Sequence, residues 1–217
     1  MESYTKYWRS IAIIMTISGL LLFTLAARAA GRIVYEQAPG HSGAFLSAER
    51  ETTIAEDFQF DQPTLISNIE WWGGYGSHTS FPSDDNFTVR LYADNGGTPG
   101  ALLHTFIVGD DALRIATGDF VLPPLPEQYF EGVPEFEYSF SLPTAFLAQA
   151  NTRYWLSIVN VLDSFEEDWS WEMSGSLLRP GVQRSFESVS WEPQSENASF
   201  LLQGAVVDTS KVVSADS

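Results

Sequence analysis

Hydrophobic and polar side chains alternate with a period of two, rather than 3.6, through most of the chain after residue 30. In 86–94, Phe87, Val89 and Leu91 fall on one face of an extended chain, which is the pattern of a half-buried strand. The same alternation returns in 136–142, and the β-branched and aromatic run at 153–161 predicts a strand buried on both faces. Further strands are predicted at 57–60, 65–72, 102–108, 169–173, 185–191 and 199–206.

The segments between these strands have the chemistry of turns. D-N-G-G-T-P-G at 94–100 separates two strands, because Asn and Gly tolerate positive φ and Pro ends a strand ladder. P-P-L-P at 123–126 cannot lie in a central strand, and helix beyond residue 30 is predicted only as one turn at 144–148. About nine short strands with very little helix predict an all-β fold, an antiparallel two-sheet sandwich, and we favour a jelly-roll-like topology.

The first thirty residues are arranged like a secretory signal peptide. Lys6 and Arg9 form a basic start, 11–25 is an uncharged apolar run, and Ala27 and Ala29 place small side chains before a cleavage point. The run is shorter than the roughly 20 residues that span a bilayer as a helix, and an uncleaved anchor is the alternative. We predict a signal peptide at 1–29, one domain at 30–206, a frayed tail at 207–217, and a secreted, extracellular or periplasmic mature protein.

Charge and cysteine content narrow the classes of partner and chemistry. The chain has 28 acidic and 11 basic residues and a formal charge of -17; without 1–29 the charge becomes -19. Binding to nucleic acid or to an anionic membrane depends on basic side chains, so neither partner is expected for the mature form. The chain has no cysteine, which excludes disulfides, thiolate catalysis and zinc–thiolate sites.

Three stretches of the chain have a distinctive sequence: I-E-W-W-G-G-Y at 69–75, D-D-N-F-T-V-R-L-Y-A-D-N-G-G-T-P-G at 84–100, and R-Y-W-L-S-I-V-N at 153–160. They resemble a bacterial exported β-sandwich domain of unknown function, of the kind found in PEP-CTERM-associated secreted proteins. The resemblance covers about 55–204 and implies a sandwich fold and export. Because the chain shows no such sorting tail, the resemblance implies release from the cell rather than sorting to the envelope. It implies no activity and no catalytic residues.

Candidate catalytic groups are few. Histidine occurs only at His41, His78 and His104, and no nucleophile elbow, His-Glu-x-x-His pair or phosphate-binding Gly-Lys-Ser/Thr loop is present. We therefore predict that the protein is not an enzyme. The alternative is a hydrolase that uses acidic residues such as Glu167 and Asp168, which precede an aromatic strand.

Oxygen donors flank the predicted strand at 86–94. Asp84 and Asp85 precede it, and Asp94 and Asn95 follow it. Clustered oxygen ligands are what Ca²⁺ requires, so these four residues are the candidate calcium ligands, and no other cofactor is predicted. The strand would separate the two groups by about 25 Å, at about 3.3 Å per residue, and turn geometry alone also explains Asp94 and Asn95.

Tryptophan and tyrosine give the leading functional hypothesis. Trp169 and Trp171 lie two residues apart and share a strand face, and Trp72 with Tyr75 borders a glycine-rich segment. If exposed, these four side chains would form a platform for sugar rings; packing in the core is the alternative. The leading hypothesis is a secreted, non-catalytic module that binds an extracellular glycan or cell-surface polymer. The second is a structural or extracellular-matrix component that assembles with itself through sheet edges.

Overall fold

A computed structural model of the chain describes residues 31–49, 51–76, 82–122, 132–161, 169–175 and 180–208. The chain divides into two compact units at Arg32/Ile33, and the fold described below belongs to the second unit. The predicted signal peptide at 1–29 and positions 209–217 of the predicted tail lie outside the described residues. Within the described ranges, no helix is long and apolar enough to cross a membrane.

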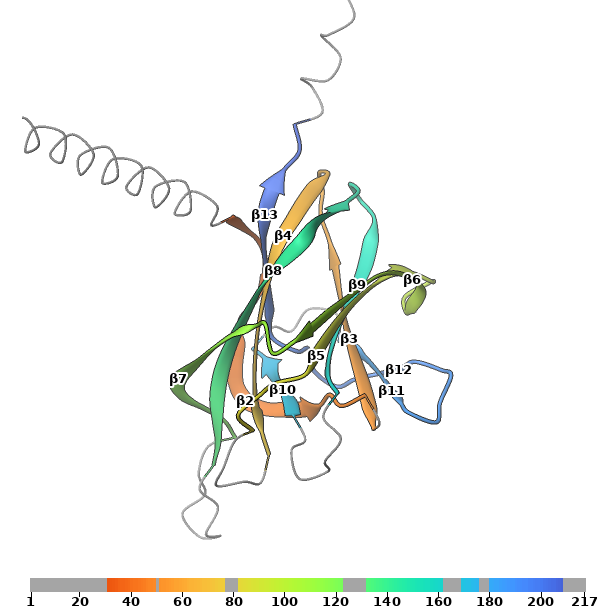
Figure 1. The fold of residues 1–217 in the computed structure, drawn as a ribbon. Coiled ribbons are helices and arrows are strands. Elements are labelled where there is room, and N and C mark those ends of the chain that lie inside the picture. The colour runs from red at the N-terminus through yellow and green to blue at the C-terminus, as the bar shows by residue number, and fades with distance from the viewer. Residues whose placement is uncertain are drawn as a thin grey trace, which may run out of the picture. The chain divides into compact units, whose positions relative to one another are not determined.

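Two antiparallel sheets make up this all-β sandwich, and thirteen strands lie in the described residues (Figure 1). The first sheet contains β1 (Arg32–Gln37), β2 (Pro39–Leu46), β4 (Thr64–Tyr75), β7 (Leu113–Leu122), β8 (Val133–Ala148), β10 (Trp169–Ser174) and β13 (Phe200–Val206). The second has the order β12 (Glu192–Pro193), β11 (Val182–Ser185), β3 (Thr52–Gln59), β9 (Arg153–Asn160), β5 (Phe87–Asp94) and β6 (Pro99–Gly109). The chain passes repeatedly between the two sheets, so strands that are neighbours in a sheet are often distant in the sequence.

Aromatic rings from both sheets fill the space between them. Trp71 of β4 stacks on Tyr138 of β8 with ring centroids 5.6 Å apart. Phe87 of the opposite sheet meets Trp71 edge-on at 5.3 Å and Trp169 at 5.1 Å. Edge-to-face and offset contacts of this kind add to the free energy gained by burying apolar area. Since the chain has no disulfide, this aromatic core is the main source of stability.

Most of the predicted strands form, but two local predictions are wrong. No helical turn exists at 144–148, because β8 continues to Ala148 and pairs there with β4. The chain reverses only after this strand, where Asn151 adopts φ +53°. The predicted strand at 185–191 is mainly a loop, because the Ser188 hydroxyl bonds the backbone at Ser190 and closes a local turn.

One end of the first sheet curls until its edges meet. The strands there follow the order β7, β8, β4, β10, β2, and β2 also contacts β7. Gly73 and Gly74 of β4 permit this close packing, since a Cβ on Gly73 would overlap Trp169 and one on Gly74 would overlap the Pro134 carbonyl. The curl buries a second face of the sheet, on the side opposite the aromatic core, and this face includes Glu135 and Glu172.

Candidate functional site

The four aromatic residues predicted as a glycan platform lie in the interior. Tyr75, Trp169 and Trp171 are fully buried, and Trp72 is 8% exposed. The rings of Trp169 and Trp171 are tilted by 35° and are not coplanar. The prediction of an exposed platform is therefore wrong for these residues, because the disulfide-free core uses the rings to join its sheets.

The candidate catalytic groups divide between described and undescribed parts of the chain. Glu167, Asp168 and His78 lie outside the described residues. His104 is exposed on β6, in the second sheet. His41 lies in the first sheet, on β2, and belongs to a cluster considered below. The described histidines are therefore in different sheets and form no common site.

The four predicted calcium ligands stay in two separate groups at opposite ends of β5. Asp85 is buried and accepts hydrogen bonds from Tyr75 and Arg114, whereas Asp84 is exposed and accepts one from the Ser83 hydroxyl. The structure keeps the two groups apart, as the length of the strand between them predicts, and whether either group binds Ca²⁺ stays a prediction.

Asp94, from the second pair of predicted calcium ligands, lines a shallow hollow of about 460 Å³. Asp94 accepts a hydrogen bond from Trp155 Nε1 at 2.9 Å and lies 3.8 Å from Arg153. Arg153 also pairs with Asp57 at 3.2 Å. Arg153 thus bridges two acidic side chains, one on β3 and one at the end of β5, and ties the turn at 94–100 to the sheet. Asn95 completes the turn through a backbone bond to Thr98.

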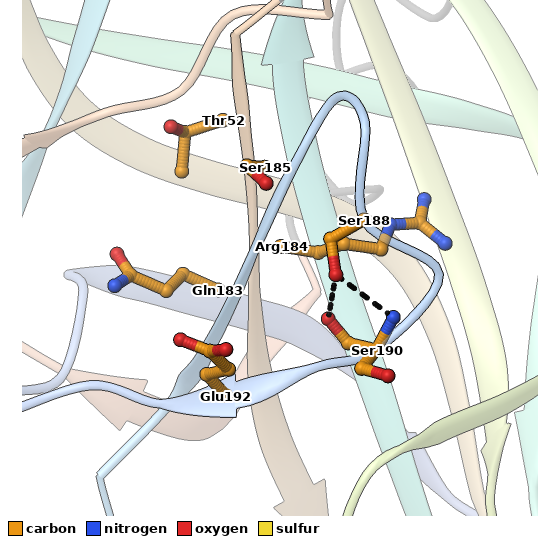
Figure 2. Close-up of a pocket in the computed structure, with 7 residues that line it drawn as sticks. All are labelled: Thr52, Gln183, Arg184, Ser185, Ser188, Ser190 and Glu192. Carbon is orange, nitrogen blue, oxygen red and sulfur yellow. Dashed lines mark hydrogen bonds between the residues drawn. The ribbon is translucent and has the colours of Figure 1, made fainter.

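A polar groove lies at the edge of the second sheet, beside β11 (Figure 2). Its volume is about 130 Å³, and hydroxyl, amide, carboxylate and guanidinium groups line it. The lining residues are Thr52, Gln183, Arg184, Ser185, Ser188, Ser190 and Glu192. Within the described part of the chain, the side chains of Gln183 and Glu192 form no hydrogen bond to another protein group, so both can bond a ligand.

Strand pairing and the loop at 186–191 shape this groove. Gln183 pairs with Ile54 of β3 on one side and with Glu192 of β12 on the other. The loop is anchored by a hydrogen bond from Phe186 N to Glu51 O at 2.7 Å. Its Phe186 side chain is 67% exposed. Arg184 points away from Gln183 in Figure 2 and stacks on the ring of Trp191, with 4.6 Å between guanidinium carbon and ring centroid.

A second polar cluster occupies the curled end of the first sheet. His41 Nδ1 lies 3.0 Å from Glu135 Oε2 and 3.3 Å from Glu172 Oε1. The backbone N–H of His41 also donates to Glu172 Oε1 at 2.9 Å. Both carboxyl groups are buried, while the imidazole is 49% exposed. Among the described residues, this is the one group of three His or acidic side chains whose ligand atoms could hold a metal ion.

The two carboxyl groups of this cluster are short of partners. Glu172 Oε2 and Glu135 Oε2 are buried without a hydrogen bond of suitable geometry. Burial raises the pKa of Glu172 to about 9, and the nearby carboxyl of Glu135 contributes to the increase. The charge of Asp119 on β7 acts in the same direction, while the backbone N–H of His41 opposes it. The cluster therefore favours a proton or a cation beside Glu172.

A comparison with known families places this fold in one of them. Residues 33–203 match the model of a domain of unknown function, DUF7901. The chain belongs to this family. The matched region of this DUF7901 chain contains the polar groove and all three residues of the His41 cluster. No curated protein matches the sequence.

Sequence reasoning missed the His41 cluster because irregular strands build it. Between the pairs Glu172/Ala44 and Ser174/Pro39, β2 places 40–43 opposite a single residue of β10, and His41 adopts φ +50° in this bulge. A second bulge on β7 places 117–119 opposite Glu135. Both segments contain Gly with Ser, Thr or Asp, a composition typical of loops. Bulges commonly redirect side chains beside functional sites, but a single glutamate in an aromatic strand gives no such signal by itself.

Proposed function

We propose that this DUF7901 domain is an exported, non-catalytic binding module whose groove at β11 takes a polyhydroxylated ligand, with an extracellular carbohydrate as the ligand class. The observation that carries the proposal is the lining of the groove. Gln183 and Glu192 face each other across the β11–β12 pair with no hydrogen-bond partner among described groups.

The chemistry of the lining fits a carbohydrate better than an apolar ligand. Planar amide and carboxylate groups bond neighbouring sugar hydroxyls, and Ser185 and Thr52 add further donors and acceptors. The exposed ring of Phe186, in the loop that shapes the groove, offers an apolar surface for the C–H face of a sugar. This assignment moves the proposed contact from the buried tryptophans to the sheet edge.

Export is the other part of the proposal. It is supported by the charged start, apolar run and small residues of 1–29, and by the resemblance to exported bacterial domains. The strongly acidic composition argues against nucleic acid and anionic lipid as partners. Fractionating cells that express the full chain tests this part: the proposal expects a shortened product outside the cytoplasm.

Carbohydrate binding is tested with the purified protein on a glycan array and in polysaccharide pull-downs, followed by calorimetry on the best ligand. Gln183→Ala and Glu192→Ala should each weaken binding about tenfold or more, as expected for losing a hydrogen bond to a polar or charged group. Glu196→Ala is the matched control, because Glu196 is exposed nearby but does not line the groove. Absence of binding to any carbohydrate, or binding by both groove variants equal to that of the unmodified chain, contradicts the proposal.

A second candidate function is self-assembly, and the edge strand β6 favours it. β6 forms the free edge of the second sheet in the described structure and carries no Asp, Glu, Lys or Arg. Its Ile107 is 74% exposed and Leu102 is 53% exposed. An edge of this kind can pair with another chain.

Light scattering at increasing protein concentration distinguishes this function from binding alone. Self-assembly predicts an oligomer that Ile107→Lys converts to a monomer. Val189→Lys is the control, since Val189 is 93% exposed but lies in the loop after β11 and not on a strand edge. A monomer at every concentration rules out assembly through β6. It does not contradict the proposal that the groove at β11 binds a ligand.

A further inference from the structure

We propose that His41, Glu135 and Glu172 form a binding site for one divalent transition-metal ion, with Zn²⁺ as the ion tested. The site is independent of the groove at β11, because it lies in the curled end of the other sheet. It draws one ligand each from β2, β8 and β10, so folding of this end of the sheet assembles it.

The spacing of the ligand atoms suits such an ion. Ligands about 2.0–2.1 Å from a metal lie about 2.9–3.4 Å apart in octahedral or tetrahedral geometry. His41 Nδ1 lies 3.0 Å from Glu135 Oε2 and 3.3 Å from Glu172 Oε1, and all three ligand atoms lie within 4.8 Å of one another. An ion could therefore be coordinated with small side-chain rotations and no change of backbone.

The burial and charge of the two glutamates give a second, independent reason to propose a metal site. Glu172 is fully buried, and no donor among the described groups bonds its Oε2 atom; the neighbouring carboxyl of Glu135 can do so only when one of the two acids carries a proton. A buried polar atom left in this way is costly unless something else binds it. A divalent cation bound between the two buried acidic groups would neutralise both of them. The described structure places no Lys or Arg in an ion pair with either glutamate.

The ligand set favours a first-row transition ion over Ca²⁺ or Mg²⁺. An imidazole nitrogen is a poor ligand for the two hard cations, which prefer oxygen, and a good one for Zn²⁺. Because His41 is 49% exposed, the site borders the surface. Three protein ligands leave at least one coordination position for water or another small ligand, as in open zinc sites.

The experiment uses the full chain, stripped of metal with a chelator and titrated with Zn²⁺ by calorimetry. The proposal expects one Zn²⁺ per chain, a higher Tm with Zn²⁺, and no displacement of the bound Zn²⁺ by Ca²⁺ at the same concentration. Glu172→Gln and His41→Asn should each weaken Zn²⁺ binding at least about tenfold. Asn is chosen at position 41 because it tolerates the φ of +50° found there.

Two matched controls should bind Zn²⁺ like the unmodified chain. Glu56→Gln removes a buried carboxyl outside the cluster, and His104→Asn removes an exposed histidine on β6. His41 is half-exposed, so His41→Asn should fold. If Glu172→Gln does not fold, the histidine variant still tests the proposal. Anomalous scattering from a zinc-soaked crystal locates the ion directly. Absence of saturable Zn²⁺ binding, or unchanged binding in both cluster variants, overturns the proposal.

Discussion

Asp85 and Glu172 are both buried carboxyl groups, but their surroundings differ. Asp85 accepts hydrogen bonds from Tyr75 and Arg114, and Arg114 Nη1 lies 3.1 Å from its Oδ1. Tyr75 is held in turn by a hydrogen bond from an asparagine amide, Nδ2 of residue 160, at 2.7 Å. Glu172 has a second acidic group, Glu135, as its neighbour, and its ion-pair contact in the described structure is with the half-exposed imidazole of His41 rather than with Lys or Arg.

The difference separates a structural centre from a candidate functional one. A buried charge whose partners are all supplied by the protein holds elements together, and here it joins the start of β5 to β7. A buried acidic pair with unsatisfied oxygens costs stability unless a proton or cation completes it. Such a pair is stabilised when a bound cation or a proton from the solvent supplies the missing partner. Substitutions at the two centres should therefore change stability in opposite directions.

Removing the partner of Asp85 should be the most damaging change. Arg114→Met leaves the buried carboxylate without its ion pair and frees the carbonyls of Pro82 and Ser83. We expect a loss of about 3 kcal/mol in the free energy of unfolding, measured by urea denaturation. Arg114→Lys is the control and should lose less, because it keeps the charge but not the several hydrogen bonds. Equal stability of Arg114→Met and the unmodified chain would contradict a structural role for this pair.

Glu172→Gln should raise the free energy of unfolding, whereas Arg114→Met lowers it. In the presence of a chelator at neutral pH, this change relieves the buried acidic pair and should raise the free energy of unfolding by about 1–3 kcal/mol. Asp85→Asn, the matched change in the other centre, should destabilise the protein. If both variants lose stability, the distinction between the two centres is wrong.

Glu56 provides a pH test of a third buried carboxyl. It is fully buried on β3, and burial raises its pKa well above the ordinary value, although the Ala198 backbone N–H bonds it at 2.8 Å. The folded state therefore keeps a proton that the unfolded chain releases above a pH of about 4.3. The free energy of unfolding should fall as pH rises from there, by up to about 1.4 kcal/mol per pH unit.

Glu56→Gln should flatten that dependence, because Gln imitates the protonated side chain. Urea denaturation at several values between pH 5 and 8 measures it, with Glu196→Gln as an exposed control. A pH profile that is identical in Glu56→Gln and the unmodified chain would show that Glu56 titrates normally.

The smallest effect is expected at the neighbour of Asp85. Asp84→Ala removes an exposed carboxylate that accepts one hydrogen bond, from the Ser83 hydroxyl, so stability should change by less than about 0.5 kcal/mol. Thermal unfolding with and without Ca²⁺ checks this and also tests the predicted calcium site. A rise in Tm with Ca²⁺ that Asp84→Ala abolishes would support that prediction.

Periodicity predicts the regular parts of the fold and fails where strands are irregular. Hydrophobic and polar residues alternate in β5, and β9 is mostly apolar. The sequence therefore predicts the positions of both strands. Periodicity misses β2 because Pro39, Gly40 and Gly43 resemble a loop, and it misses β7 because Gly118 interrupts the pattern. Those two strands supply the imidazole of the cluster and the nearby charge of Asp119, so the same irregularity conceals the candidate metal site.

The burial of Trp169 and Trp171 shows a second limit of prediction from the sequence. Their spacing correctly places both on one face of a strand, but it does not say whether that face meets water or a second sheet. Glu172 lies on the opposite face, which an isolated sheet would expose. It is buried because β2 and β7 meet over it.

The sequence by itself determined the all-β class, the absence of thiol chemistry and most of the strand positions, because these depend on residue type and on a local period of two. Only the tertiary structure decided which faces are buried, which carboxyl groups have partners, and that His41, Glu135 and Glu172 meet. These three residues are far apart in sequence, and two bulges and one curl of the sheet bring them together. Long-range pairing of this kind depends on the whole fold, which no local pattern encodes.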